Sequence, residues 1–153
     1  MKTITSILKE MSFFKGMDDK HLAALASCAR NAQFKTGEII FKEGDRSSWF
    51  YVLKSGRVAI EVNIVGKGTM IIQTISDGDV LSWSWMVPPF KKHFGARAMQ
   101  LTRAIAFDGE CVRKKCEEDH SLGYELFKRF SVIISQRLDA TRLQLIDMYG
   151  GKK

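Results

Sequence analysis

The middle of the chain is a series of short β-prone runs that alternate with glycine-bearing turns, and no helical segment separates one run from the next. Glycine at these turns allows the positive φ angles that tight reversals of the chain require. Parallel strands need long, usually helical crossovers, which this series has no room for, so it predicts an antiparallel β-structure. The strands are expected at residues 38–41, 49–53, 57–62, 69–75 and 96–107.

Helical periodicity flanks this region on both sides. Apolar residues between Leu22 and Ala29 recur at helical spacing behind Asp18, a favourable N-cap, and another short helix is expected around residues 7–14. Through residues 121–148, apolar positions three and four apart form one long stripe. The predicted fold class is therefore α+β, mainly β: a compact antiparallel barrel or sandwich with N-terminal helices and a long C-terminal helix.

A chain of 153 residues can bury one hydrophobic core but is short for two, so we expect a single domain over residues 1–153. Its expected parts are N-terminal helices at 1–32, a β-roll at 33–108 and C-terminal helices at 109–149. No apolar run approaches the roughly 20 residues that cross a bilayer, and the N-terminus lacks a signal-peptide core. We therefore expect a cytoplasmic protein without a membrane partner.

Three cysteines, Cys28, Cys111 and Cys116, are too few and too scattered for a disulfide framework, so we expect reduced thiols. Cys111 and Cys116 lie five positions apart, which does not bring two thiolates together on a helix, and the three histidines fall in different elements. We therefore expect no metal or haem site. The sequence also contains no hydrolase elbow, phosphate-binding loop or metalloprotease helix, so we expect no catalytic residues and no enzymatic activity.

The order of these elements and their turn residues resembles the cyclic nucleotide-binding domain of catabolite activator protein and its Crp/Fnr-like relatives. For the strands, the resemblance implies an antiparallel jelly-roll or cupin-like β-barrel. The resemblance rests on residues 34–45 (FKTGEIIFKEGD), 50–58 (FYVLKSGRV) and 77–81 (DGDVL). Family members that regulate transcription continue into a helix-turn-helix domain, whereas this sequence ends at residue 153. The resemblance therefore implies a stand-alone sensor of a small molecule, with no sequence-specific DNA binding by this chain alone.

The same resemblance places a ligand cassette at residues 78–98, where family members hold the ribose with a glutamate and the cyclic phosphate with an arginine. Trp83 stands at the glutamate position, and a tryptophan donates one N–H but accepts nothing. Lys92 or His93 stands at the arginine position, and a lysine supplies a point charge without the bidentate fork. The cassette therefore diverges from the family pattern, which favours a non-standard anionic or nucleotide-like ligand.

Three hypotheses follow for the cassette: a pocket remodelled for another ligand, a cavity filled by Trp83, Trp85, Phe90 and Phe94, and unmodified binding of cyclic AMP or cyclic GMP. In the family the long helix reaches the purine through a hydroxyl, and by that match Thr141 is the contact. None of the three hypotheses for the cassette requires a cofactor. The candidate ligand-binding residues are Gly78, Asp79, Ser82, Trp83, Ser84, Trp85, Lys92, His93, Arg97, Thr141 and Arg142.

The leading hypothesis is a non-catalytic regulatory domain for signal transduction that binds a small molecule, forms a homodimer through its C-terminal helix and acts on a protein partner. The alternative is a ligand-free interaction module that dimerises through Leu138, Leu145 and their neighbours. A formal net charge of +7 suits an anionic partner, so non-specific nucleic-acid binding is a third hypothesis, which a salt titration would test.

Overall fold

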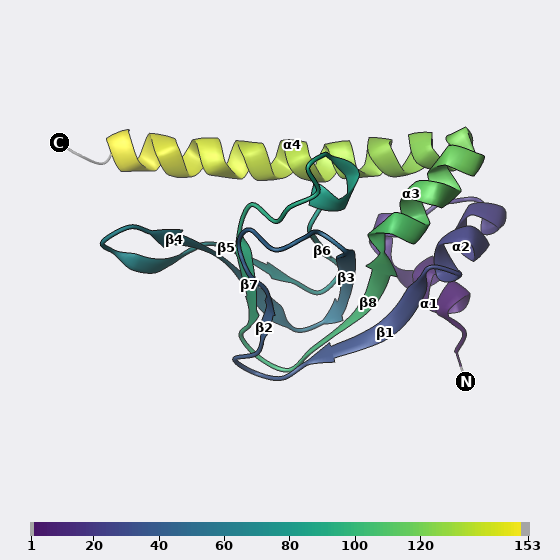
Figure 1. The fold of residues 1–153 in the computed structure, drawn as a ribbon, viewed down its shortest axis with the longest axis horizontal. Helices are drawn as coiled ribbons and strands as arrows, with labels where there is room; N and C mark the ends of the chain where they lie inside the picture. Colours follow the sequence, from purple (N-terminus) through teal and green to yellow (C-terminus); the bar gives the residue numbers. More distant parts are fainter. Residues whose placement is uncertain (1, 151–153) are drawn as a thin grey trace.

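A computed structural model describes residues 2–150 of the chain. The helical elements are α1 (Ile4–Glu10), the 3₁₀ turn η1 (Ser12–Phe14), α2 (Asp19–Ala26), the 3₁₀ turn η2 (Ser84–Met86), α3 (Gly109–Glu118) and α4 (His120–Gly150). The strands are β1 (Ala29–Phe34), β2 (Ile39–Phe41), β3 (Trp49–Ser55), β4 (Arg57–Ile64), β5 (Gly68–Ser76), β6 (Val80–Leu81), β7 (Gly95–Ala98) and β8 (Thr102–Asp108). α1, α2 and α3 lie at one end, and α4 runs along the whole length of the molecule (Figure 1).

The strands form two antiparallel sheets of four, in the orders β1-β8-β3-β6 and β2-β7-β4-β5. Alternate residues of the first sheet enter different cores because successive side chains of a strand point to opposite faces. Val52 and Val80 pack in the core beneath the helices, whereas their neighbours Leu53 and Leu81 pack in the interior of the roll. The first sheet is thus buried on both faces and separates the roll interior from the helical layer.

The helix-side core is built on Phe50 of β3. Its ring stacks on Trp85 with 4.6 Å between ring centroids and on Phe107 with 4.7 Å, and the edge of Phe130 meets it at 5.4 Å. These contacts bring together β3, η2, β8 and α4. The turn that follows β6 is therefore held against the first part of α4 by aromatic packing.

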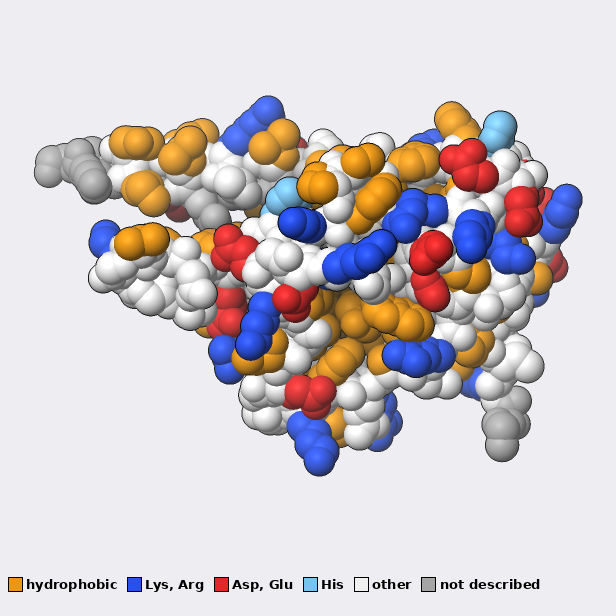
Figure 2. Space-filling view, viewed as in Figure 1, with side chains coloured by type: hydrophobic (Ala, Val, Ile, Leu, Met, Phe, Trp, Pro, Cys, Tyr) orange, Lys and Arg blue, Asp and Glu red, His pale blue; other side chains and the backbone are white. Residues whose placement is uncertain are grey.

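The distal part of α4 extends beyond this core and runs above the β4–β5 hairpin (Figure 1). Gln144 Nε2 donates to the Ile72 carbonyl oxygen at 3.1 Å and so joins the helix to the hairpin. Figure 2 shows hydrophobic side chains on both arms and a notch between them. The exposed large apolar residues on these arms are Val65, Met70, Ile71, Ile72, Leu138, Leu143, Leu145, Ile146, Met148 and Tyr149.

The prediction of antiparallel β-structure with N-terminal helices and a long C-terminal helix is confirmed, but neither sheet closes on itself into a barrel. The expected strand at 96–107 is two strands, because the chain leaves one sheet as β7 and enters the other as β8. β1 was not expected: the helical spacing continues to Ala29, yet α2 ends at Ala26 and Ala29 pairs with Phe107. Met1 and residues 151–153 of the expected domain lie outside the described range.

The expectation of three reduced thiols is wrong, because Cys28 and Cys111 form a disulfide. The pairing of β1 with β8 brings the end of α2 next to the start of α3, and Asp108 N donates to the Cys28 carbonyl oxygen at 2.9 Å. Two cysteines 83 positions apart are adjacent only in the folded chain. Within residues 2–150, no cluster of three metal-ligating side chains occurs and no helix is long and apolar enough to span a bilayer.

Candidate functional site

The cassette, residues 78–98, begins in the β5–β6 turn and ends with β7, and the backbone just before β7 is held against the turn that follows β2. Lys92 N donates to the Asp45 carbonyl oxygen, and Gly44 N donates to the Lys92 carbonyl oxygen, both at 2.8 Å. Ser47 N donates to the Phe90 carbonyl oxygen at 2.6 Å. Phe90 is one of two non-glycine residues with positive φ among the described residues. These bonds fix the direction in which the side chain of Lys92 leaves the backbone.

Lys92 points into the molecule and is only 5% exposed. Its ammonium donates to Ser82 Oγ at 2.7 Å and to the Trp49 carbonyl oxygen at 2.8 Å, and it lies 4.1 Å from the centroid of the Phe41 ring. A neutral hydroxyl, a carbonyl and an aromatic face all accept a cation without neutralising it. The charge of Lys92 is therefore buried without a bonded counter-charge.

This environment changes the acidity of Lys92. Burial lowers the pKa of its ammonium from 10.5 to about 7, and the carboxylate of Asp45 opposes part of that change. Among residues 2–150, the salt bridges do not include Lys92. At neutral pH the side chain is thus close to its titration midpoint, and any anion brought near it would favour the protonated form.

A chain of hydroxyls extends from Lys92 through the cassette. Ser82 Oγ lies 3.3 Å from Ser84 Oγ, and the Ser84 hydroxyl donates to Ser47 Oγ at 2.8 Å. All three serines are buried. Ser82 has a φ of 81°, a left-handed conformation that is uncommon for a residue other than glycine, and its hydroxyl accepts from the Lys92 ammonium.

The two tryptophans of the cassette lie in different places. Trp85 is 2% exposed and belongs to the helix-side core, on the face of the sheet away from the roll interior. Trp83 is half-buried beside Phe94, at 6.2 Å between ring centroids, and the guanidinium of Arg137 lies over the Trp83 ring, 4.8 Å from its centroid. Of the four aromatic residues that the filled-cavity hypothesis places in the roll interior, Trp85 packs in the helical layer instead.

Arg137 joins α4 to the cassette and was not among the residues selected from the sequence. Its Nη2 donates to the Val80 carbonyl oxygen, and burial lowers the pKa of the side chain to about 10, so that it remains charged at neutral pH. Arg137 thus contacts both β6 and Trp83, at the point where α4 crosses the roll. Its position one helical turn before Thr141 is the sequence signal that could have identified it.

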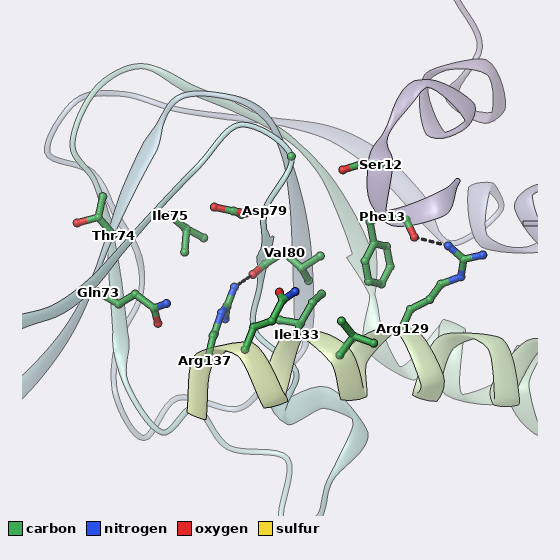
Figure 3. A pocket seen from close by; sticks show the side chains of 13 residues that line it. Ser12, Phe13, Gln73, Thr74, Ile75, Asp79, Val80, Arg129, Ile133 and Arg137 are labelled. Atoms are coloured by element: carbon green, nitrogen blue, oxygen red, sulfur yellow. Dashed lines mark hydrogen bonds between the residues drawn. The ribbon is translucent and has the colours of Figure 1, made fainter. Parts of the chain in front are cut away.

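A cavity of about 480 Å³ lies beside this contact, between η1, the β5–β6 turn and α4 (Figure 3). Arg137 reaches across to Val80 at one end, and Arg129 donates to the Phe13 carbonyl oxygen at the other, at 2.6 Å. Gly78 and Asp79, both selected from the sequence, line this cavity. Asp79 also stabilises the β5–β6 turn, because its carboxylate accepts from Ser76 N at 2.9 Å.

The remaining residues selected from the sequence lie apart from Lys92. Neighbouring His93 is exposed, which distinguishes the two positions that the sequence left open. Arg97 forms a salt bridge with Glu61 at 3.3 Å across the β4–β7 pair. Thr141 and Arg142 are exposed on α4, where the Thr141 hydroxyl donates to the Arg137 carbonyl oxygen and Arg142 pairs with Asp139.

The fold and the cassette match a known protein family. A family model described as the cyclic nucleotide-binding domain matches residues 32–119, more than half of the chain. The chain belongs to the cyclic nucleotide-binding domain family. The matched region contains both sheets, apart from the start of β1, together with the whole cassette and α3.

Individual relatives agree with this membership. A CRP-like cAMP-activated global transcriptional regulator of Mycobacterium tuberculosis is 21% identical over 93% of this chain, and the match covers 62% of that regulator. A cGMP-dependent protein kinase of Toxoplasma gondii is 33% identical over 38% of this chain but only 6% of the kinase. This cyclic nucleotide-binding domain thus spans less than two thirds of either curated relative.

The fold is shared with solved members of the family. The crystal structure of a cyclic nucleotide-binding domain from Methylobacillus flagellatus KT superposes with a TM-score of 0.80 over 95% of this chain and 82% of that one, at 15% sequence identity. The resemblance expected from the turn motifs is therefore confirmed at the level of fold and family.

Proposed function

We propose that this cyclic nucleotide-binding domain is a non-catalytic, cytoplasmic sensor whose cassette binds a small anionic ligand through Lys92. The observation that carries the proposal is the ammonium of Lys92, buried at 5% exposure and hydrogen-bonded to neutral partners only. Burial of a cation without a bonded counter-charge is unfavourable, the Asp45 carboxylate offsets only part of that penalty, and a bound anion would relieve more of it. The positive charge is therefore placed where an anionic group gains most from it.

The ligand class follows from the relatives and from the departures in the cassette. The mycobacterial relative is described as cAMP-activated and the apicomplexan kinase as cGMP-dependent, so cyclic nucleotides are the first candidates. Trp83 offers no acceptor to a ribose hydroxyl, and Lys92 offers a point charge instead of a fork. The proposed ligand is therefore an anionic or nucleotide-like molecule whose recognition depends on charge and stacking more than on ribose contacts.

Arg137 supports a route from the cassette to α4. Its guanidinium lies over Trp83 and its Nη2 donates to the Val80 carbonyl oxygen, so a ligand that moved Trp83 would change how α4 is docked. The distal part of α4 carries exposed apolar side chains that suit a partner surface. We propose that this surface transmits the signal, through a second copy of the chain or through another protein.

The alternative, a ligand-free module with an aromatic-filled pocket, receives less support. It requires the cassette aromatics to occupy the roll interior, yet Trp85 packs with Phe50 and Phe130 on the other face of the sheet. A buried lysine beside three buried serines is also an unfavourable way to fill a cavity that has no ligand to bind.

A thermal-shift series tests the proposal, because a ligand that binds only the native state raises the melting temperature. Cyclic AMP, cyclic GMP, cyclic dinucleotides and inorganic phosphate are compared on the native chain, Lys92→Met and Lys91→Met. Lys91 is the matched control because it is adjacent but exposed. We expect a shift with at least one anion that Lys92→Met loses and Lys91→Met keeps. No shift with any of them, or an equal shift in both variants, would contradict the proposal.

A further inference from the structure

The Cys28–Cys111 disulfide joins two layers that are otherwise held by non-covalent contacts. Cys28 lies between α2 and β1 and is 6% exposed, whereas Cys111 lies in the first turn of α3 and is half-buried. Their Cα atoms are 5.7 Å apart, within the range usual for disulfides. The bond therefore fixes the start of α3 against the N-terminal helical layer without needing a rearrangement of the backbone.

The same turn of α3 supports the cassette. Arg113 Nη1 donates to the Trp85 carbonyl oxygen at 2.6 Å, and its guanidinium lies 4.2 Å from the centroid of the Phe90 ring. Gly109 packs so tightly beneath η2 that an added Cβ would lie 2.9 Å from Trp85 Cβ. The position of α3 thus decides where the backbone of η2 can lie.

The far end of α3 leads directly into α4. Cys116 packs against Gly123 of α4, where an added Cβ would lie 3.3 Å from Cys116 Cβ. The carboxylate of Asp119, between the two helices, accepts from Ser121 N at 3.1 Å and caps α4. α3 therefore connects the cassette to the long helix, and Cys111 adds a covalent bond from α3 to the α2–β1 junction.

We propose that Cys28 and Cys111 form a reversible redox lock, which couples the thiol–disulfide state of the cell to the packing of the cassette and α4. In the oxidised chain α3 is fixed to the α2–β1 junction. In the reduced chain only non-covalent contacts hold α3 there, among them the bonds from Asp108 N to the Cys28 carbonyl oxygen and from Gly109 N to the Ser48 carbonyl oxygen, so its first turn and η2 open more readily. This inference does not depend on which ligand the cassette binds.

The oxidant is a small-molecule disulfide such as glutathione disulfide. The thiolate of the more accessible Cys111 attacks one sulfur of glutathione disulfide, whose S–S bond breaks and releases one glutathione as a thiol. Cys28, after loss of its proton, attacks the resulting mixed disulfide at the Cys111 sulfur and releases the second glutathione. The chain loses two electrons and two protons, and one glutathione disulfide is reduced to two thiols.

Cys116 is not part of this pair. It lies five positions along α3 from Cys111, so the two thiols leave the helix in different directions. Burial, with help from the carboxylates of Glu117 and Asp119, raises the pKa of the Cys116 thiol to about 11, which keeps it from forming the nucleophilic thiolate. Cys116→Ser is accordingly the matched control for variants of the other two cysteines.

The first experiment tests whether the bond forms and reverses. The native chain is equilibrated with glutathione disulfide or with dithiothreitol, denatured under acid quench, and its free thiols are counted and mapped by peptide mass. We expect one free thiol, at Cys116, after oxidation and three after reduction. Cys116→Ser should give none and two, and reduction should lower the melting temperature by about 5–15 °C. Failure of the Cys28–Cys111 cross-link to form would overturn the proposal.

The second experiment tests whether the disulfide controls α3 and η2 locally or only stabilises the whole domain. Hydrogen exchange is compared in the oxidised and reduced native chain at residues 84–86, 109–118 and, as a reference, 57–64. We expect exchange at the first two segments to rise by roughly tenfold or more on reduction, while β4 changes little. An equal change in all three segments, or none, would mean that the bond does not control α3 and would refute the inference. The native chain is sufficient, so a Cys28→Ser variant that fails to fold does not affect the test.

Discussion

Replacing Lys92 by methionine should make the stability of the domain less dependent on pH. In the folded chain the pKa of Lys92 is about 7, against 10.5 for an exposed lysine. Between these values the unfolded chain holds a proton that the folded chain has released, so the free energy of unfolding rises with pH in this window. Below pH 7 the unfavourable burial of the charge is present in full, and above pH 10.5 it is absent.

The size of the effect follows from this window. Each pH unit between the two pKa values contributes up to about 1.4 kcal/mol, and less close to the folded pKa, so the interval from pH 6 to pH 9 contributes about 3 kcal/mol. Methionine has a similar length and no charge, so Lys92→Met should lose this contribution. The free energy of unfolding of Lys92→Met minus that of the native chain should therefore be about 3 kcal/mol larger at pH 6 than at pH 9. Any change in packing caused by the substitution is the same at both pH values and cancels from this comparison.

Urea unfolding of both chains at pH 6, 7, 8 and 9 measures the difference, with Lys91→Met as control. The exposed control should track the native chain at every pH. The reasoning would be refuted by a difference between Lys92→Met and the native chain that stays constant from pH 6 to pH 9, because Lys92 would then titrate as an ordinary lysine.

Three further substitutions test the packing around the cassette. Gly109→Ala should lower the free energy of unfolding by roughly 1–3 kcal/mol in urea, because its new Cβ would meet Trp85 Cβ at 2.9 Å; unchanged stability would contradict the close contact. Arg137→Met should cost about 1.5–3 kcal/mol and speed hydrogen exchange in distal α4, whereas exposed Arg142→Met should do neither. Thr141→Val should change stability by less than about 0.5 kcal/mol in the unliganded chain, and a larger loss would show a structural role.

The general architecture could be predicted from the sequence because its determinants are local. Gly44, Gly56 and Gly78 adopt the positive φ angles that the turn pattern indicated. The apolar stripe over residues 121–148 lies on one continuous helix, α4. β1 could not be predicted in this way. Residues 29–34 are a strand because they pair with β8, about seventy positions later, and this tertiary pairing overrides a local helical pattern.

The candidate site was less accessible to sequence reasoning, because burial and direction depend on long-range packing. The sequence could not decide whether Lys92 or His93 stands at the arginine position of the family. In the structure, the backbone bonds to the turn at Asp45 direct Lys92 inward. Trp85 looked like a pocket residue, but it lies in η2 and packs on Phe50 and Phe130 in the helical layer. The disulfide depends on the pairing of β1 with β8, so neither the number nor the spacing of the cysteines indicates it.

The most direct test of the Lys92 account is its titration in the native chain, followed by the NMR signals of ¹³C-labelled lysine side chains with Lys92→Met to assign the resonance. The account predicts a pKa near 7 in the unliganded domain, and a pKa higher by one unit or more when the domain is saturated with whichever tested anion gives the largest thermal shift. A Lys92 that titrates near 10.5 without ligand, or whose pKa does not respond to a saturating anion, would contradict it.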